Sequence, residues 1–293
     1  MSDYDSLITE IAELAPLPAA YLRVRELVRD PDSDVQDLAR VISSDPALTA
    51  RLLRLANSAY IGLISTVDTI PRAVQVLGMN TVHDLALAGS AMQSCDRIAG
   101  ASFDIYRFWR RSIYCAVLAQ MIATEVGRGD PSRLFVAGLL HDVGHLILQA
   151  RRKGAQAEVL QRAIQNGQAL ARIEREVYGY DYAELGSALL ESWLLPEAIH
   201  VPVRYHVDPI ANPLPEHAFE TAAVHVAAIL ARGAVWRDES DEPVPEFNLV
   251  ALALTRVDAE QTQLLLDRSA AQVASTMQSL MPQSAAQQPH KKS

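Results

Sequence analysis

The sequence predicts an all-α protein. Apolar residues recur at spacings of three and four along most of the 293 residues, which places them on one face of a helix, and the alternation typical of strands is scarce. Local signals separate these segments. Asp45-Pro46 combines a capping residue with proline at the first helical position, and Gly78 is a helix-stop residue. With no internal repeat, the pattern favours a bundle of helices joined by short connections.

The predicted helices are short at first and longer later. In the first hundred residues we expect them at about 7–14, 22–28, 35–42, 46–56, 70–77 and 80–88, with Ser33 or Asp34 as a cap and a loop at 95–103. A long helix should follow at about 104–126, and Ser132 should begin the helix that carries His141-Asp142. The remaining helices are expected at about 155–166, 168–178, 181–193, 196–205, 217–232, 248–255 and 258–280.

Composition and charge narrow the class of protein. The formal net charge is −9, and Cys95 and Cys115 are the only cysteines. Two cysteines are too few for a disulfide framework and fit a reducing compartment. An acidic chain repels the phosphate backbone of a nucleic acid, so binding to DNA or RNA would need a local basic patch. No signal pattern or apolar run of roughly 20 residues is found, so we expect a cytoplasmic protein with no membrane partner.

The most informative feature is the pair His141-Asp142, which ends the apolar run 135–140. Burying a carboxylate beside an imidazole is unfavourable unless a partner compensates both. A divalent metal does so, because imidazole nitrogen and carboxylate oxygen suit several divalent ions, and so does a tight hydrogen-bond network. The pair therefore predicts a metal site or a site that has lost its metal. A simpler interpretation is a core pair that fixes helix packing.

Several separate motifs together resemble the HDOD domain, a relative of the HD phosphohydrolase superfamily found in bacterial signalling proteins. The motifs are Leu17-Pro18, 45–59, 70–74, Leu77-Gly78, 138–144, 178–186 and 193–196. Their order and approximate spacing match from about residue 7 to about residue 230.

The resemblance implies a two-lobed helical fold. We expect a smaller N-terminal helical lobe at 1–103 and a larger HD-like lobe at 104–232. Composition beyond them predicts an acidic linker at 233–247, C-terminal helices at 248–280 and a disordered tail at 281–293. The helix at 258–280 should pack on the HD-like lobe; covering a groove and self-association are the alternatives.

The same resemblance implies a five-part metal site, made of an upstream His, the His-Asp pair, one or two downstream His and a late Asp, and this chain departs from several parts of it. The His-Asp pair is kept, and His206 keeps one member of a downstream histidine pair. Arg111 stands in the place of the upstream histidine, Tyr182 in the place of the histidine of a Gly-x-Asp-His pattern, and Ala228 in the place of the late aspartate.

Arg111 decides our interpretation of the site. A guanidinium stays protonated in proteins and cannot ligate a metal. It can instead pair with the Asp142 carboxylate and compensate the buried charge. The sequence therefore predicts a vestigial pocket with no metal, no cofactor and no catalytic residue. Its members are Arg111, His141, Asp142, Tyr182 and His206.

Other conspicuous residues have simpler explanations. Isolated histidines and tryptophans on helices are more often structural than functional. In this chain these residues are His145, His200, His225, Trp109 and Trp193. The segment 34–60 has the outline of a helix-turn-helix in which Arg40, Arg51 and Arg54 are candidate phosphate contacts. Neighbouring aspartates oppose them, and such helix pairs are commoner as packing units. We do not expect nucleic-acid binding.

We therefore expect a non-catalytic bacterial signal-transduction protein that acts by binding other signalling proteins. A first alternative is a residual metal-dependent phosphohydrolase or phosphodiesterase acting on a nucleotide or cyclic dinucleotide, which His141, Asp142 and His206 favour. A second alternative is a sensor that binds a nucleotide ligand through Arg111 without turnover.

Overall fold

The structure, a computed structural model, describes residues 3–58, 61, 66–99, 103–235 and 243–281. These residues form α-helices and two short 3-10 helices and contain no strand, so the all-α prediction is confirmed. The helices are α1 (Asp3–Leu14), α2 (Ala19–Arg29), α3 (Val35–Ser43), α4 (Pro46–Ala56), α5 (Ile70–Leu77), α6 (Met79–Ile98), α7 (Ile105–Val126), α8 (Pro131–Leu140), α9 (Val143–Arg151), α10 (Lys153–Asn166), α11 (Leu170–Tyr178), α12 (Tyr182–Ser192), α13 (Glu197–Tyr205), η1 (Pro209–Ala211), η2 (Pro215–His217), α14 (Ala218–Ala234), α15 (Leu249–Thr255) and α16 (Ala259–Leu280).

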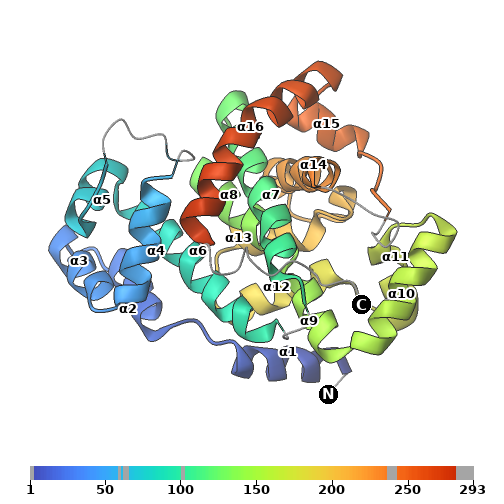
Figure 1. Cartoon of the computed structure of the whole chain (residues 1–293), viewed down its shortest axis with the longest axis horizontal. Helices are drawn as coiled ribbons and strands as arrows, with labels where there is room; N and C mark the ends of the chain where they lie inside the picture. Colours follow the sequence, from blue (N-terminus) through green and yellow to red (C-terminus); the bar gives the residue numbers. More distant parts are fainter. Residues whose placement is uncertain (1–2, 59–60, 62–65, 100–102, 236–242, 282–293) are drawn as a thin grey trace, which may run out of the picture.

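The N-terminal lobe is built from short helices with defined starts. Figure 1 shows α2 to α5 gathered at one end of the molecule, and α6 packs against α2, α4 and α5. Asp34 and Asp45 accept backbone N–H groups of the first turns of α3 and α4, as N-cap residues do. The sequence left Ser33 and Asp34 as alternatives for the first of these caps, and Asp34 is the one used.

The larger lobe is centred on α7. Helices α8, α14 and α16 pack directly against it, and α12 packs against both α9 and α13. One apolar cluster runs from the N-terminal helices through this lobe to α16, and α6 joins the two parts by contacting α8 and α9. A second, small cluster lies between α10 and α11. The helix pair α10–α11 therefore has a core of its own.

The two ends of the described chain lie against distant segments. At the start, α1 packs on α12, and the Tyr4 hydroxyl donates to the Glu184 carbonyl at 3.2 Å. At the end, α16 contacts both α7 and α4, and Arg54 Nε donates to the Ser279 carbonyl at 2.7 Å. Helix α16 therefore bridges the two lobes as well as packing on the larger one. The lobe boundary between residues 103 and 104 stays a prediction.

The structure corrects two details of the predicted helices. The expected loop at 95–103 is wrong for its first part, because α6 continues to Ile98 and keeps Cys95 and Ile98 buried. Helix α8 begins at Pro131, where Asp130 accepts the N–H groups of Ser132 and Arg133, so Asp130 rather than Ser132 marks the start. The predicted tail from residue 282 and the linker residues 236–242 lie outside the described residues. None of the described helices is long and apolar enough to cross a membrane.

Candidate functional site

The His141-Asp142 pair occupies the turn between α8 and α9, and both side chains are fully buried. Glycines bring the flanking helices close to their neighbours. A Cβ atom at Gly138 would lie 2.8 Å from the Ala116 Cα atom of α7, and one at Gly144 would overlap the Tyr182 carbonyl of α12. The pair is therefore held where α7, α8, α9 and α12 converge.

Four basic side chains surround the Asp142 carboxylate. Arg111 Nε lies 2.6 Å from Oδ2, and His141 Nε2 lies 3.3 Å from the same oxygen. His145 Nε2 and Arg232 Nη2 each lie 3.7 Å from Oδ1. The predicted pairing of Arg111 with Asp142 is thus present, and Arg232 adds a second guanidinium to it.

The charges of this cluster follow from burial and from the two arginines. Burial alone would raise the pKa of the Asp142 carboxyl, but Arg111 and then the neighbouring basic groups hold that pKa well below its usual value. Burial lowers the pKa of His141 to about 4, against the opposing effect of Asp142. Burial, followed by His141, also lowers the pKa of His206 well below its usual value. At neutral pH the site therefore holds an ionised Asp142 carboxylate and neutral imidazoles at His141 and His206.

A hydrogen-bonded chain links Arg232, Tyr182 and His206. Arg232 Nη2 donates to the Tyr182 hydroxyl at 2.8 Å, and this hydroxyl lies 3.3 Å from His206 Nε2. His206 Nδ1 lies 2.7 Å from the Val203 carbonyl, which can only accept, so Nδ1 carries the proton and Nε2 accepts from Tyr182. The ring of His145 stacks on Tyr182 at 3.7 Å between centroids. Tyr182 thus occupies the centre of the site.

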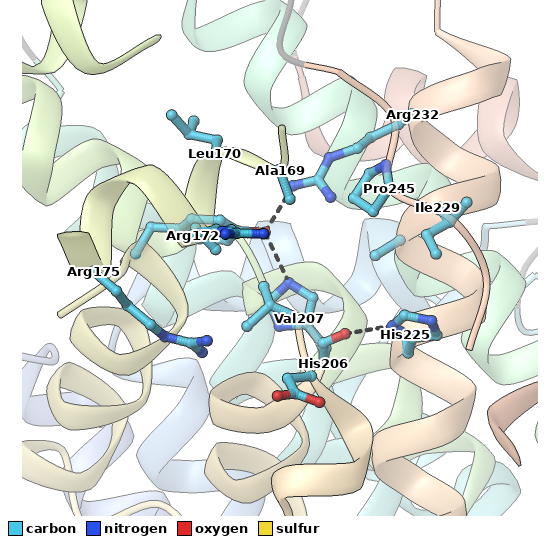
Figure 2. Close-up of a pocket in the computed structure, with 14 residues that line it drawn as sticks. Ala169, Leu170, Arg172, Arg175, His206, Val207, His225, Ile229, Arg232 and Pro245 are labelled. Atoms are coloured by element: carbon cyan, nitrogen blue, oxygen red, sulfur yellow. Dashed lines mark hydrogen bonds between the residues drawn. The ribbon is translucent and has the colours of Figure 1, made fainter. Parts of the chain in front are cut away.

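His225 supports this chain from α14. Its Nδ1 atom donates to the His206 carbonyl at 2.6 Å, and its Nε2 atom accepts the Asn248 backbone N–H at 3.0 Å. The first of these contacts is visible in Figure 2. Burial lowers the pKa of His225, which keeps it in the neutral form that can both donate and accept. The structural interpretation of His225 agrees with these contacts.

The site partly retains the shape of a metal centre. Ligand atoms of His141, Asp142 and His206 lie within 4.8 Å of one another. His141 Nδ1 faces the Gly138 carbonyl at 2.7 Å, so Nε2 carries the lone pair, and this buried atom has no hydrogen-bond partner among the described atoms. Against this, Arg111 already contacts Asp142, and a fixed guanidinium repels a dication. The residues present therefore do not fit a divalent metal.

The structure brings all five predicted pocket residues together, and sequence reasoning missed two others. Arg232 is 5% exposed and contacts both Asp142 and Tyr182. It lies one helical turn after Ala228, the position where the HD pattern has an aspartate, and a lone arginine in the apolar segment 222–234 was the available signal. His145 stacks on Tyr182 and faces Asp142, whereas its helical setting alone had indicated a structural or surface residue.

A cavity of about 220 Å³ is lined by Tyr182, His206 and Arg232, whereas Asp142 is not among its lining residues. Figure 2 shows its walls: the start of α11 with Arg172 and Arg175 on one side, and α14 with His225, Ile229 and Arg232 on the other. The cavity lining is Ala169, Leu170, Ala171, Arg172, Arg175, Tyr182, His206, Val207, Asp208, His225, Ala228, Ile229, Arg232 and Pro245.

The candidate phosphate contacts of the N-terminal lobe have internal partners. Arg51 donates to the Gly89 carbonyl at 2.8 Å, Arg54 donates to the Ser279 carbonyl, and Arg40 pairs with Asp37 at 3.0 Å. The two tryptophans are also anchored: the Trp109 and Trp193 indole groups donate to Asp96 and to the Ala15 carbonyl. The arginine contacts favour the packing interpretation of the segment 34–60, and the indole contacts favour a structural role for the two tryptophans.

Comparisons with known proteins agree with the fold. A family model described as the HDOD domain matches residues 14–209. A candidate phosphohydrolase from Shewanella amazonensis SB2B is 27% identical, with a TM-score of 0.70 over 94% of this chain and 98% of that one. An HDOD domain protein with unknown function from Geobacter sulfurreducens is 24% identical, with a TM-score of 0.73 over 95% of this chain and all of that one.

One curated relative is longer than this chain. An uncharacterized protein from Treponema pallidum (strain Nichols) is 23% identical over 262 residues, which are 87% of this chain and 48% of that protein. The chain thus spans about half the length of this relative.

Proposed function

The chain belongs to the HDOD domain family, and we propose that it is a non-catalytic regulatory protein that acts by binding other signalling proteins. The observation that carries the proposal is the contact of 2.6 Å between Arg111 Nε and Asp142 Oδ2. This contact compensates the one carboxylate of the His-Asp pair with a side chain instead of a metal. Arg232 strengthens the effect from α14, and Tyr182 uses His206 Nε2 as a hydrogen-bond acceptor.

A residual metal-dependent phosphohydrolase is the second candidate function. The unpartnered Nε2 atom of His141 favours it, because this lone pair faces the region that a metal would occupy. Ala228 opposes it by offering no ligand, and Tyr182 opposes it by keeping a phenol where the HD pattern has an imidazole. A bound metal would have to displace Arg111 from Asp142 before it could lower the pKa of a water molecule.

Hydrolysis assays separate the two candidates. We expect no metal-dependent turnover of nucleotides or cyclic dinucleotides when Mn²⁺, Fe²⁺ or Ni²⁺ is supplied. The Arg111→His variant should remain inactive as well, because Tyr182 and Ala228 still replace two ligands. A triple variant with Arg111→His, Tyr182→His and Ala228→Asp is the matched control, since it restores the ligand type at all three of these positions. Turnover by the unmodified protein that depends on metal would contradict the non-catalytic role.

The binding role needs a separate test. Cross-linking in the cells of origin followed by mass spectrometry should identify signalling proteins joined to one defined face of the protein. Cross-links that merely follow the abundance of the captured proteins, with no preferred face, would contradict a regulatory role through protein–protein interaction.

A further inference from the structure

The cavity beside the vestigial site is lined by three arginines from two helices. Arg172 and Arg175 come from α11, and Arg232 comes from α14. Arg232 is 5% exposed, so its guanidinium is almost fully withdrawn from water. Asp208, an exposed residue, is the carboxylate among the described lining residues. The charged side chains of the lining are therefore mainly arginines, which are hydrogen-bond donors with positive charge.

The carboxylates that pair with these arginines lie outside the lining. Arg175 Nη2 is 2.6 Å from the buried Asp181 carboxylate. Arg172 Nε is 3.4 Å from Glu176, which also pairs with Arg162 at 2.6 Å, so one carboxylate serves two cations. A guanidinium has five N–H donors, and contacts of this kind use only part of them. The arginines can thus keep these partners and still bind an anion in the cavity.

The backbone N–H groups at the start of α11 add partial positive charge to the cavity. The lining includes Ala169, the N-cap residue, and Leu170, Ala171 and Arg172 of the first turn. Ala169 has no side chain that could accept a hydrogen bond from this turn, and none caps the helix there. The first N–H groups of a helix have no intrahelical acceptor and carry partial positive charge, which favours anions.

We propose that this cavity binds a small organic anion, with its phosphoryl or carboxylate group between Arg172 and Arg232 and with Arg175 adding positive charge farther along the wall. The apolar side chains of Leu170, Ile229 and Pro245 in the lining would contact the rest of the ligand. At about 220 Å³ the cavity lies below the roughly 300–1,000 Å³ typical of pockets for drug-sized ligands. The ligand is therefore smaller than a cyclic dinucleotide. The inference rests on the proposed function: the bound anion would be the signal to which the regulatory protein responds.

Calorimetric titration at constant ionic strength tests the site, with phenyl phosphate, benzoate and uncharged benzyl alcohol as probes. We expect one or both anions to bind and benzyl alcohol not to bind. A preference for phenyl phosphate or for benzoate identifies the phosphoryl or carboxylate class. Absence of binding for both anions, or equal binding of the alcohol, would overturn the inference.

Matched variants locate the binding. Arg172→Gln should weaken anion binding about tenfold, equivalent to ~1.4 kcal/mol. Arg162→Gln should leave it unchanged, because Arg162 pairs with the same Glu176 but does not line the cavity. Equal losses in both variants would show a non-specific charge effect and overturn the assignment.

A second pair of variants avoids the risk of misfolding. Ala169→Asp introduces a favourable N-cap residue and places a negative charge at the cavity, so it should raise the Tm while weakening anion binding. Thr69→Asp, at the N-cap of α5, where no side chain caps the helix, adds the same charge away from the cavity and should leave binding unchanged. Unaltered binding by Ala169→Asp would contradict the proposed site. Release of phenol from bound phenyl phosphate would support the site while contradicting the non-catalytic role.

Discussion

The two sides of the layer formed by Tyr182, His206 and Arg232 differ in how charge is compensated. On the inner side, the buried Asp142 carboxylate meets two guanidinium groups, so its negative charge is compensated within the protein. On the outer side, arginines line an open cavity whose lining carries fewer carboxylates than cations among the described residues. The inner side therefore acts as part of the core, and the outer side is available for a ligand.

Asp142→Asn should have the largest effect, because it leaves Arg111 and Arg232 without the charge that they compensate. Removing one partner of a buried ion pair typically costs about 3–5 kcal/mol. Urea unfolding measures the change, and Asp267→Asn on the exposed face of α16 is the control, with an expected loss within about 0.5 kcal/mol. A variant as stable as the control would show that the inner cluster is not a structural element.

Gly144→Ala should also destabilise strongly, since the added Cβ atom would overlap the Tyr182 carbonyl and push α9 away from α12. Overpacking of this kind costs about 1–3 kcal/mol, or more where backbone must move. Gly154→Ala is the matched control, because a Cβ atom there meets nothing within 4 Å and helix propensity favours alanine. Equal thermal stabilities of the two variants would contradict the close approach that places His145 on Tyr182.

Acidification should destabilise the protein through its buried imidazoles. Burial lowers the pKa of His141 from 6.5 to about 4, and it also lowers the pKa of His206 and His225. Between about pH 6.5 and pH 4 the unfolded chain then binds more protons than the folded chain, so stability falls as the pH falls. Asp181, whose pKa burial raises to about 6, opposes this trend, and so does Asp96, whose pKa burial also raises.

His141 alone should account for about 3 kcal/mol of that pH dependence. Asp142 adds a loss of the same sign only in more acidic solution, because its pKa in the folded protein lies well below its usual value. Unfolding measurements across the pH window test this. Stability that stays constant or rises on acidification would contradict neutral, buried imidazoles at the site.

Tyr182→Phe should have the smallest effect, because it removes one hydroxyl and keeps the ring stacked on His145. The lost contacts are those to Arg232 at 2.8 Å and to His206 at 3.3 Å. An expected loss of about 1 kcal/mol follows from their typical net contribution. Tyr106→Phe, at an exposed ring, should leave the unfolding free energy unchanged, and a similar effect of both variants would contradict the hydrogen-bonded layer.

The sequence predicted features that depend on neighbours along the chain. Asp45-Pro46 and Gly78 marked helix ends correctly because caps and stops act within one turn. The loop expected at 95–103 was wrong because α6 extends through Cys95 and Ile98, which are buried by tertiary packing that the local pattern does not encode.

The candidate site likewise contains features that the sequence predicted and features that depend on tertiary packing. The pairing of Arg111 with Asp142 was predictable, because the motif identifies both positions. Arg232 was missed because ninety positions separate it from Asp142, and its place in an apolar segment does not indicate which residue it contacts. The cavity was not predictable either, since it arises where the start of α11 meets α14 and the residues after α13.

The metal content of the protein, measured by mass spectrometry on untagged material purified without added metal or chelator, tests most directly the proposal that the site has lost its metal. Compensation of Asp142 by Arg111 and Arg232 predicts a content near zero per chain. Stoichiometric Fe, Mn, Ni or Zn would show that a metal displaces Arg111 and that the site is a functional metal centre.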